Sequence, residues 1–277
     1  MRKLLHADFA RLWKDKALWL AMAVAALFGV IICLSQFNAM VNYDVDMSEE
    51  LPRLYMNSYL MLCIALAAFT NLFLGTEYSD GTIRNKLVTG CSRSGIYLSG
   101  YITCVVGGLL MQAAFMLVVT VMGVPMFGFK TEFLRPVGTY TLVGVLLICC
   151  EIAIYTMVSM LCQNKAAVAV LCQVVTFALI MYGSWLMSAL SAPEFYDVAT
   201  KAADGSIIME TVRNESYLTG HKRQIYEFLT DFIPMAQGYT IAGLDSAHPA
   251  LLGLYSVIIG GLSTAAGLLG FRKKDLK

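Results

Sequence analysis

Six long apolar runs constrain this chain more than any other feature of its sequence. They lie at about 17–37, 56–76, 100–126, 137–161, 166–190 and 250–271. A helix rises about 1.5 Å per residue and a bilayer core is about 30 Å thick, so a span needs about 20 mostly apolar residues. With 58% hydrophobic and only 14% charged residues, the chain is unlike soluble domains. We therefore expect an all-α membrane protein with six transmembrane helices and one domain over residues 1–277.

The distribution of Lys and Arg predicts how these runs are oriented. Basic residues gather before the first run, after the second and fourth runs, and after the last one, whereas acidic residues dominate the other connections. Short connections rich in Lys and Arg stay on the cytoplasmic side during insertion. Both termini and the segment 77–99 are therefore expected in the cytoplasm.

The sequence of residues 1–16 predicts a basic amphipathic helix. Leu5, Phe9, Leu12 and Trp13 recur at helical spacing and would share one face. We expect this helix to lie in the inner membrane interface. A solvated basic lead-in to the first span is the alternative.

The segment 77–99 combines turn, helix-start and basic signals. Asp80 is expected to cap a helix beginning at Gly81, Arg84 and Lys86 would lie on that short amphipathic helix, and Gly90 would end it. The segment thus predicts a short helix across the cytoplasmic mouth of the bundle. A generic positively charged loop is the alternative.

The connection 191–249 is far longer than the others, and long connections often carry function. Ile225, Phe228, Leu229, Phe232 and Ile233 repeat at helical spacing before Pro234, which predicts an amphipathic helix that ends there. We interpret Phe228, Phe232 and Pro234 as an outer gate. A surface helix that covers the bundle without gating is the alternative.

Few polar residues interrupt the apolar runs. Asn71, Gln112, Glu151 and Gln173 are candidates for a translocation pathway, and Glu151 lies near the middle of the fourth run. A charge at that depth costs roughly 2.5–3.5 kcal/mol on insertion scales, so it should face the bundle interior or stay protonated. Glu151 could contact a cationic substrate or carry a proton, or it could be an uncharged carboxyl bonded to a neighbouring helix.

The last run carries small residues at every third or fourth position: Gly253, Ser256, Gly260, Thr264 and Gly267. Such a stripe allows close helix approach, within the chain or at a subunit contact. The eight cysteines lie in the runs or at their cytoplasmic ends, which predicts free thiols. No Cys or His spacing indicates a metal site, and we expect no nucleic acid partner.

The segment that follows the second predicted span resembles part of a known family of membrane proteins. The string Glu77, Tyr78, Gly81, Thr82, Ile83, Arg84, Ser92 and Arg93 after the second of six spans resembles the permeases of ABC-2 type ABC transporters. The resemblance is to the bacterial antibiotic-peptide branch in particular, which includes bacitracin and lantibiotic immunity systems. Leu12, Lys14 and Lys16, and the run Phe232 to Pro234, are similar to further features of this family. The chain departs from the pattern at Cys91, where proline is common, and at Ser99 and Gly100, where Ser-Lys is often seen.

The resemblance implies a function and partners. A permease of this kind sits in the bacterial plasma membrane, pairs with a second permease copy or a homologous one, and exports amphipathic or lipophilic substrates such as antimicrobial peptides. Its helix between the second and third spans docks on ABC ATPase subunits, which bind ATP and Mg²⁺. In this chain the resemblance assigns ATPase docking to Glu77, Asp80, Gly81, Thr82, Ile83, Arg84, Lys86 and Arg93.

The remaining sequence features agree with a transport subunit that is not itself an enzyme. The chain has no GxxxxGK[ST] phosphate loop, so ATP hydrolysis would need a separate subunit. A secondary carrier or channel subunit without an ATPase is the alternative, but it should show several intramembrane charges or paired broken helices. A membrane enzyme would need catalytic groups paired at depth, and only Glu151 is present there.

Overall fold

The computed structural model describes residues 2–43, 50–162, 164–201 and 207–274, and it is almost entirely helical. In chain order the elements are α1 (Arg2–Lys14), α2 (Lys16–Tyr43), α3 (Leu51–Met56), α4 (Ser58–Ser79), α5 (Thr82–Val88), α6 (Arg93–Val118), a π-helical turn (Val119–Gly123), α7 (Val124–Phe127), a 3-10 turn (Thr131–Phe133), α8 (Leu134–Leu161), α9 (Lys165–Leu190), β1 (Phe195–Lys201), β2 (Ile207–Arg213), α10 (Gly220–Phe232), α11 (Pro234–Gly243) and α12 (Pro249–Lys273).

The prediction of six membrane-length apolar helices is confirmed. In the described part of the chain, the helical segments long and apolar enough to cross a membrane are Lys16–Tyr43, Leu51–Ser79, Arg93–Phe127, Thr131–Leu161, Lys165–Leu190 and Pro249–Lys273. The second is longer than predicted, because α4 continues to Ser79 and places Glu77 inside the helix. The third begins at Arg93. The connection between them is therefore much shorter than the predicted 77–99.

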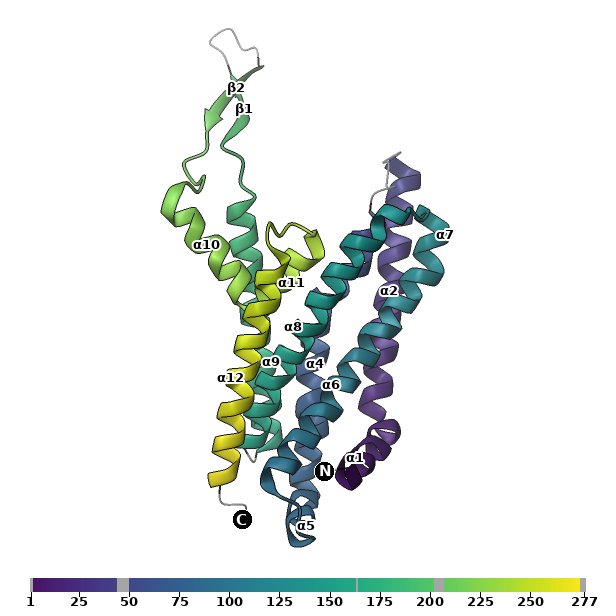
Figure 1. Ribbon diagram of the computed structural model, residues 1–277. Helices are drawn as coiled ribbons and strands as arrows, with labels where there is room; N and C mark the ends of the chain where they lie inside the picture. The colour runs from purple at the N-terminus through teal and green to yellow at the C-terminus, as the bar shows by residue number, and fades with distance from the viewer. Residues whose placement is uncertain (1, 44–49, 163, 202–206, 275–277) are drawn as a thin grey trace.

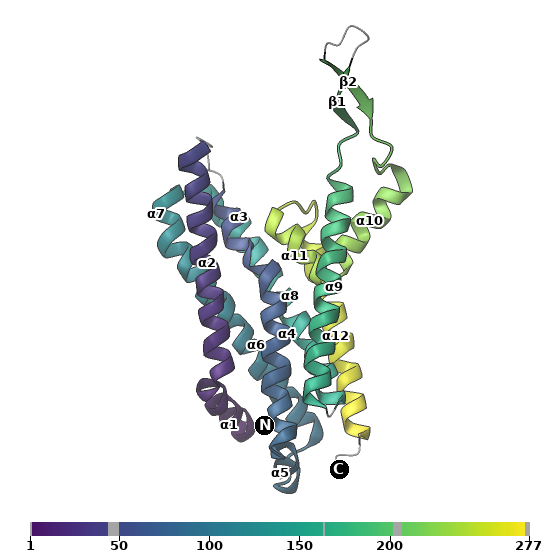
Figure 2. The ribbon, with the colours of Figure 1, turned by 180° about the vertical axis from the view of Figure 1, so that it is seen from behind.

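Both termini and α5 lie at one end of the bundle, which we call the terminal end (Figure 1). The β1–β2 hairpin projects from the opposite end, which we call the hairpin end. Seen from either side, α2, α6 and α7 form one flank, α9 and α12 form the other, and α4 and α8 lie between them (Figures 1 and 2). The two central helices therefore connect the flanks.

The small residues of α12 pack within the chain. A Cβ added at Gly260 would lie 3.2 Å from the Cα of Cys150 on α8, so a glycine is needed for this backbone approach. One turn earlier, the Ser256 hydroxyl donates to Gln237 of α11 at 2.9 Å. Of the two settings expected for the small-residue stripe, internal packing is the one observed.

The long connection 191–249 holds more structure than the sequence predicts. β1 and β2 pair antiparallel, with Phe195 opposite Arg213. Because the described side chains of both strands are exposed or half-buried, they show no apolar-polar alternation that would reveal them. Pro234 also does more than end a helix: it begins α11, whose first five residues are all buried.

Candidate functional site

The short helix α5 at the terminal end is built by its glycines rather than by a side-chain cap. Gly81 precedes α5 with φ +68°, a left-handed conformation that other residues rarely adopt. Asp80 is instead the C-cap residue that follows α4, so its predicted role as an N-cap is wrong. Gly90 follows α5 with φ +85°. There the amides of Gly90 and Cys91 donate to the carbonyls of Leu87 and Lys86, a Schellman motif that ends the helix where predicted.

Only part of the predicted docking set reaches the surface. Asp80 and Arg84 are exposed, Gly81 and Thr82 are half-buried, and Ile83 is buried at 2% exposure. The side chain of Val88, which is not among the predicted docking residues, is 87% exposed at the end of α5. A single exposed apolar residue forms no recognisable pattern in a sequence. Val88 stands out only because the structure places it, exposed, at the end of α5. Asp80, Arg84 and Val88 form what we call the α5 surface.

Glu77 and Lys86 lie behind that surface, in a buried ion cluster with two residues of α1. The Glu77 carboxylate accepts from Arg11 at 2.5 Å and from Lys86 at 2.6 Å. Lys86 also contacts Asp8 at 2.8 Å. The other Asp8 oxygen accepts from the Ser99 hydroxyl of α6 at 2.5 Å. Two carboxylates thus balance two cations, and the cluster fastens α1, α4, α5 and α6 together.

The burial of the cluster makes it sensitive to the loss of any member. The side chains of Glu77 and Asp8 are 1% and 3% exposed, and that of Lys86 is 11% exposed. Arg11 additionally donates to the Phe73 carbonyl at 3.0 Å and covers the Phe73 ring at 3.8 Å. Removing one partner of such a buried set typically costs about 3–5 kcal/mol, because an uncompensated charge remains.

The ion cluster changes the interpretation of two predicted docking residues. Glu77 and Lys86 point inward, so in this conformation they position α5 instead of offering a docking surface. Helix α1 is held against the bundle by the buried residues Leu4, Asp8 and Leu12, whereas Trp13 of the predicted interfacial face is 51% exposed. Pairing over such sequence distances leaves no local signal.

Arg93, the last predicted docking residue, caps the end of α12. Its guanidinium donates to the carbonyls of Phe271, at 3.2 Å, and Lys274. The Lys274 ammonium in turn donates to the Met160 carbonyl of α8 at 3.1 Å and lies over the Tyr78 ring. Burial lowers the pKa of Lys274. The terminal ends of α4, α6, α8 and α12 are therefore tied together near α5.

Two of the four predicted pathway residues hold helices together. Asn71 donates to the Ala67 carbonyl of its own helix at 2.7 Å and accepts from Ser159 of α8. Gln173 of α9 donates to the Ile64 carbonyl of α4 at 3.3 Å. These contacts give Asn71 and Gln173 a structural role between α4, α8 and α9.

The other two pathway residues are buried without full hydrogen bonding, and the Oε1 atom of Gln173 also lacks a partner in the described part of the chain. Glu151 is 2% exposed, and its Oε1 atom has no partner in the described part of the chain. Both polar side-chain atoms of Gln112 likewise lack a partner there. Unpaired buried polar atoms are costly, so these two residues keep their standing as pathway candidates.

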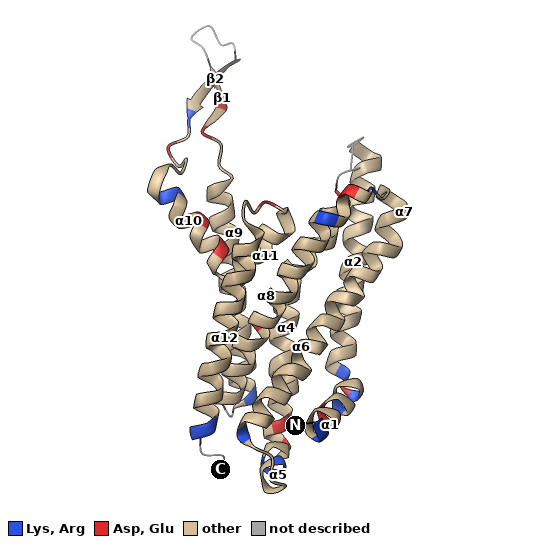
Figure 3. Cartoon of the chain, viewed as in Figure 1, with Lys and Arg blue, Asp and Glu red and all other residues tan. Residues whose placement is uncertain are grey.

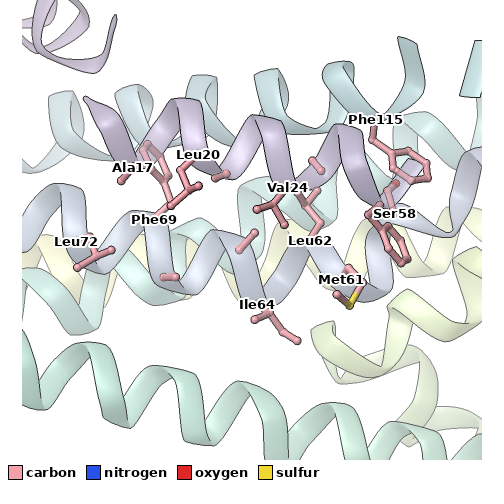
Figure 4. Close-up of a pocket in the computed structure, with 15 residues that line it drawn as sticks. Ala17, Leu20, Val24, Ser58, Met61, Leu62, Ile64, Phe69, Leu72 and Phe115 are labelled. Atoms are coloured by element: carbon pink, nitrogen blue, oxygen red, sulfur yellow. The ribbon is translucent and has the colours of Figure 1, made fainter. Parts of the chain in front are cut away.

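An apolar groove of about 270 Å³ lies between α2 and α4, and Phe115 of α6 contributes to its wall. Figure 4 shows Leu20 and Val24 of α2 and Leu62 and Phe69 of α4 among its lining residues. Fourteen of its fifteen lining residues are apolar; Ser58 is the exception. Such a groove matches apolar chains and offers almost nothing to a polar ligand.

The predicted gate residues at the hairpin end pack on α12. The rings of Phe228 and Phe232 stack with centroids 5.3 Å apart, and both meet Tyr255 edge-on at 6.0 and 5.7 Å. Pro234 is buried at the start of α11. These contacts hold α10 against the bundle, which fits a closed gate and a covering helix equally well.

Six apolar helices of membrane-spanning length, with a short helix and a buried ion cluster at one end, define a helical multi-pass membrane protein. The model of the ABC-2 family transporter proteins matches residues 4–186, more than half of the chain, so the chain belongs to this family. The comparison with curated proteins found no match. Family membership identifies the chain as the membrane component of an ABC transporter, and the family generally works with ATPase subunits.

Proposed function

We propose that this chain is the permease of an ABC exporter and that its α5 surface receives the ATPase. The observation that carries the proposal is the placement of the ion cluster directly behind α5, where Lys86 connects α5 to Glu77 of α4 and Asp8 of α1. A force on α5 would pass through these buried contacts to the ends of the spans. The ATPase subunits would supply that force when they bind ATP and Mg²⁺.

Charge supports a cytoplasmic location for the terminal end. Lys and Arg gather on α1, α5 and the end of α12 (Figure 3), as expected for the side where an ATPase is available. The protein would then reside in a bacterial plasma membrane, with the β1–β2 hairpin outside. A second permease copy or a homologous permease would complete the pathway.

The α2–α4 groove supports an amphipathic or lipophilic substrate, of which antimicrobial peptides are one class. Its lining would accept an apolar chain at membrane depth. Glu151 and Gln112 would then contribute polar contacts in a different arrangement of the helices. Movement between two arrangements of one bundle is how ligand binding at one side is transmitted to the other.

Site-specific photocrosslinking tests the docking assignment. A benzophenone amino acid at Val88 should capture a subunit that carries a phosphate loop, identified by mass spectrometry of native membranes. The matched control is the same amino acid at Met209, whose side chain is 68% exposed at the hairpin end. Capture from Met209 and not from Val88 would overturn the assignment.

Substitutions on the α5 surface give a second readout. Arg84→Glu and Val88→Asp should each reduce ATPase co-purification about tenfold or more, as expected for central contact residues. The control Lys222→Glu changes an exposed cation of α10 at the hairpin end. If active transport persists and no ATPase ever co-purifies, the chain is a carrier or channel subunit.

A further inference from the structure

The α2–α4 groove runs lengthwise between two membrane spans (Figure 4). Its lining extends from Ala17 to Phe28 on α2 and from Leu72 back to Ser58 on α4. At about 1.5 Å per residue, it follows about 17 Å of one helix and about 21 Å of the other. One leaflet of a bilayer core is about 15 Å thick. The groove is therefore slightly longer than one leaflet, and it begins at the terminal end, where α2 itself begins.

Alanines create the groove. Five of its lining residues are Ala17, Ala21, Ala25, Ala65 and Ala68. The three on α2 repeat at every fourth position and so share one face of the helix, where their small side chains leave space next to α4. Leu20 and Val24 flank this space and are 67% and 49% exposed. The groove is therefore open to the outside of the bundle at membrane depth.

The terminal end of the groove carries residues typical of a membrane surface. Trp13 and Trp19 are 51% and 52% exposed, and their ring centroids lie 6.2 Å apart. The Trp19 indole N–H donates to the Trp13 carbonyl at 2.9 Å, which fixes the pair. Exposed tryptophans gather where the apolar core of a membrane meets water. This boundary therefore falls at the corner between α1 and α2, where the groove begins at Ala17.

Two cations lie at the same corner. Lys14 ends α1, Lys16 begins α2, and both are exposed. Two positions along a chain span at most about 7 Å, so both flexible side chains can reach one phosphate. Within the described ranges neither lysine makes an ion pair, whereas Asp15 between them accepts from the Ala17 amide at 2.7 Å and so caps α2. Two lysines against one carboxylate leave the corner positively charged.

We propose that the α2–α4 groove binds one acyl chain of an anionic phospholipid, whose phosphate contacts Lys14 and Lys16. The apolar lining accepts a hydrocarbon chain, but it cannot select among lipids, because they all carry such chains. The lysines provide the selection. Each lysine near an anionic membrane surface strengthens binding about fivefold, and a headgroup without net charge gains little from them. The length of the groove, the tryptophans and the lysines thus agree on one occupant.

Photolabelling of the full-length protein in lipid nanodiscs tests the proposal. The probe is phosphatidylglycerol with a diazirine on one acyl chain, and the matched probe is phosphatidylcholine with the same chain and no net charge. Labelled peptides are identified by mass spectrometry. The face of α9 around Val174, which is 61% exposed, is the reference for unselective lipid contact.

We expect phosphatidylglycerol to label the groove peptides at least about fivefold more than phosphatidylcholine, and both probes to label α9 equally. Equal labelling of the groove by the two probes overturns the proposal. Absence of label in the groove, as when a second copy of the chain covers it, overturns the proposal as well.

Variants that fill the groove locate the acyl chain. Ala21→Phe and Ala68→Phe should each remove most of the groove labelling, because the new ring occupies the space between α2 and α4. The matched control is Ala23→Phe, which places the same ring at an exposed position of α2 that does not line the groove. If Ala21→Phe does not fold, Ala68→Phe decides, and labelling unchanged by the filling overturns the proposal.

Variants of the lysines locate the headgroup. Lys14→Gln and Lys16→Gln should each lower the preference for phosphatidylglycerol several-fold while the label of phosphatidylcholine stays the same. The control Lys273→Gln removes an exposed cation at the end of α12, on the other flank of the bundle, and should leave the preference unchanged. A preference that survives removal of both Lys14 and Lys16 overturns the assignment of the headgroup.

This inference goes beyond the proposed function, because it concerns a lipid of the surrounding bilayer and requires only that α2 and α4 cross the membrane. The assay contains no ATPase and no ATP, so a failure to find an ATPase partner leaves its result unchanged. A failure of lipid labelling likewise leaves the docking experiments at α5 untouched.

Discussion

Neutralising Glu77 should destabilise the protein more than neutralising an exposed carboxylate. In Glu77→Gln the shape of the side chain is retained, but Arg11 and Lys86 lose the charge that both of them contact. Breaking a buried ion pair costs about 3–5 kcal/mol. We expect the lower end, about 3 kcal/mol, because Lys86 keeps Asp8 at 2.8 Å and the Arg11 side chain is 30% exposed.

The matched control is Glu50→Gln. Glu50 pairs with Arg53 at 3.1 Å, and their side chains are 30% and 52% exposed. An exposed pair contributes about 0–1 kcal/mol, so the two substitutions should differ by at least about 2 kcal/mol. The free energy of unfolding is measured by titrating mixed micelles with sodium dodecyl sulfate and following the helical circular dichroism.

A double-mutant cycle separates the ion pair from other effects of substitution. Lys86→Met alone leaves Asp8 and Glu77 with one cation between them, whereas the combined variant removes one charge of each sign. The combined loss should therefore be smaller than the sum of the two single losses by about 1–3 kcal/mol. A Glu77→Gln variant as stable as Glu50→Gln, or strictly additive losses, would refute the reasoning about the cluster.

Three further predictions follow from other parts of the structure. Gly260→Val should lower stability by about 1–3 kcal/mol because its side chain would meet the backbone of Cys150, whereas Gly261, which has nothing within 4 Å, should tolerate the same change in a thermal-unfolding comparison. Glu151→Gln should alter the rate or pH dependence of transport in reconstituted vesicles; unchanged transport at every pH would remove Glu151 from the pathway. Because burial raises the pKa of Asp231 in the folded protein, its ionised carboxylate destabilises the fold above that pKa, and this cost disappears as the pH falls. The melting temperature of Asp231→Asn should therefore exceed that of the unaltered protein near pH 7 and converge with it in acid. A lower melting temperature for Asp231→Asn at pH 7 would contradict this reasoning.

Local patterns explain which parts of the fold could be predicted. Span positions depend on the length and apolarity of single runs, and so each predicted run overlaps one of the observed segments, with ends that differ by up to seven residues. The α10 helix and the end of α5 at Gly90 were recovered for a similar reason, since helical periodicity and a glycine stop are local signals. The hairpin was missed because its exposed strands bury no face.

The candidate site could be predicted only in part. The sequence drew attention to the region around α5, but it assigned Glu77 and Lys86 to a docking surface and Asp80 to a cap. The structure shows Glu77 and Lys86 inside and Asp80 at the end of α4. Charge and position in the chain indicated the right segment, whereas the direction of each side chain depends on how α1 and α4 pack against α5.

The sequence by itself determined that this chain crosses a membrane with six helices, because twenty consecutive apolar residues have few other stable environments. Only the tertiary structure decided which charges meet. Asp8 and Ser99 are 91 positions apart and share a hydrogen bond, and Arg11, Glu77 and Lys86 come from different elements to one ion cluster. Contacts of this kind depend on helix packing, which the order of residues along a single helix does not specify.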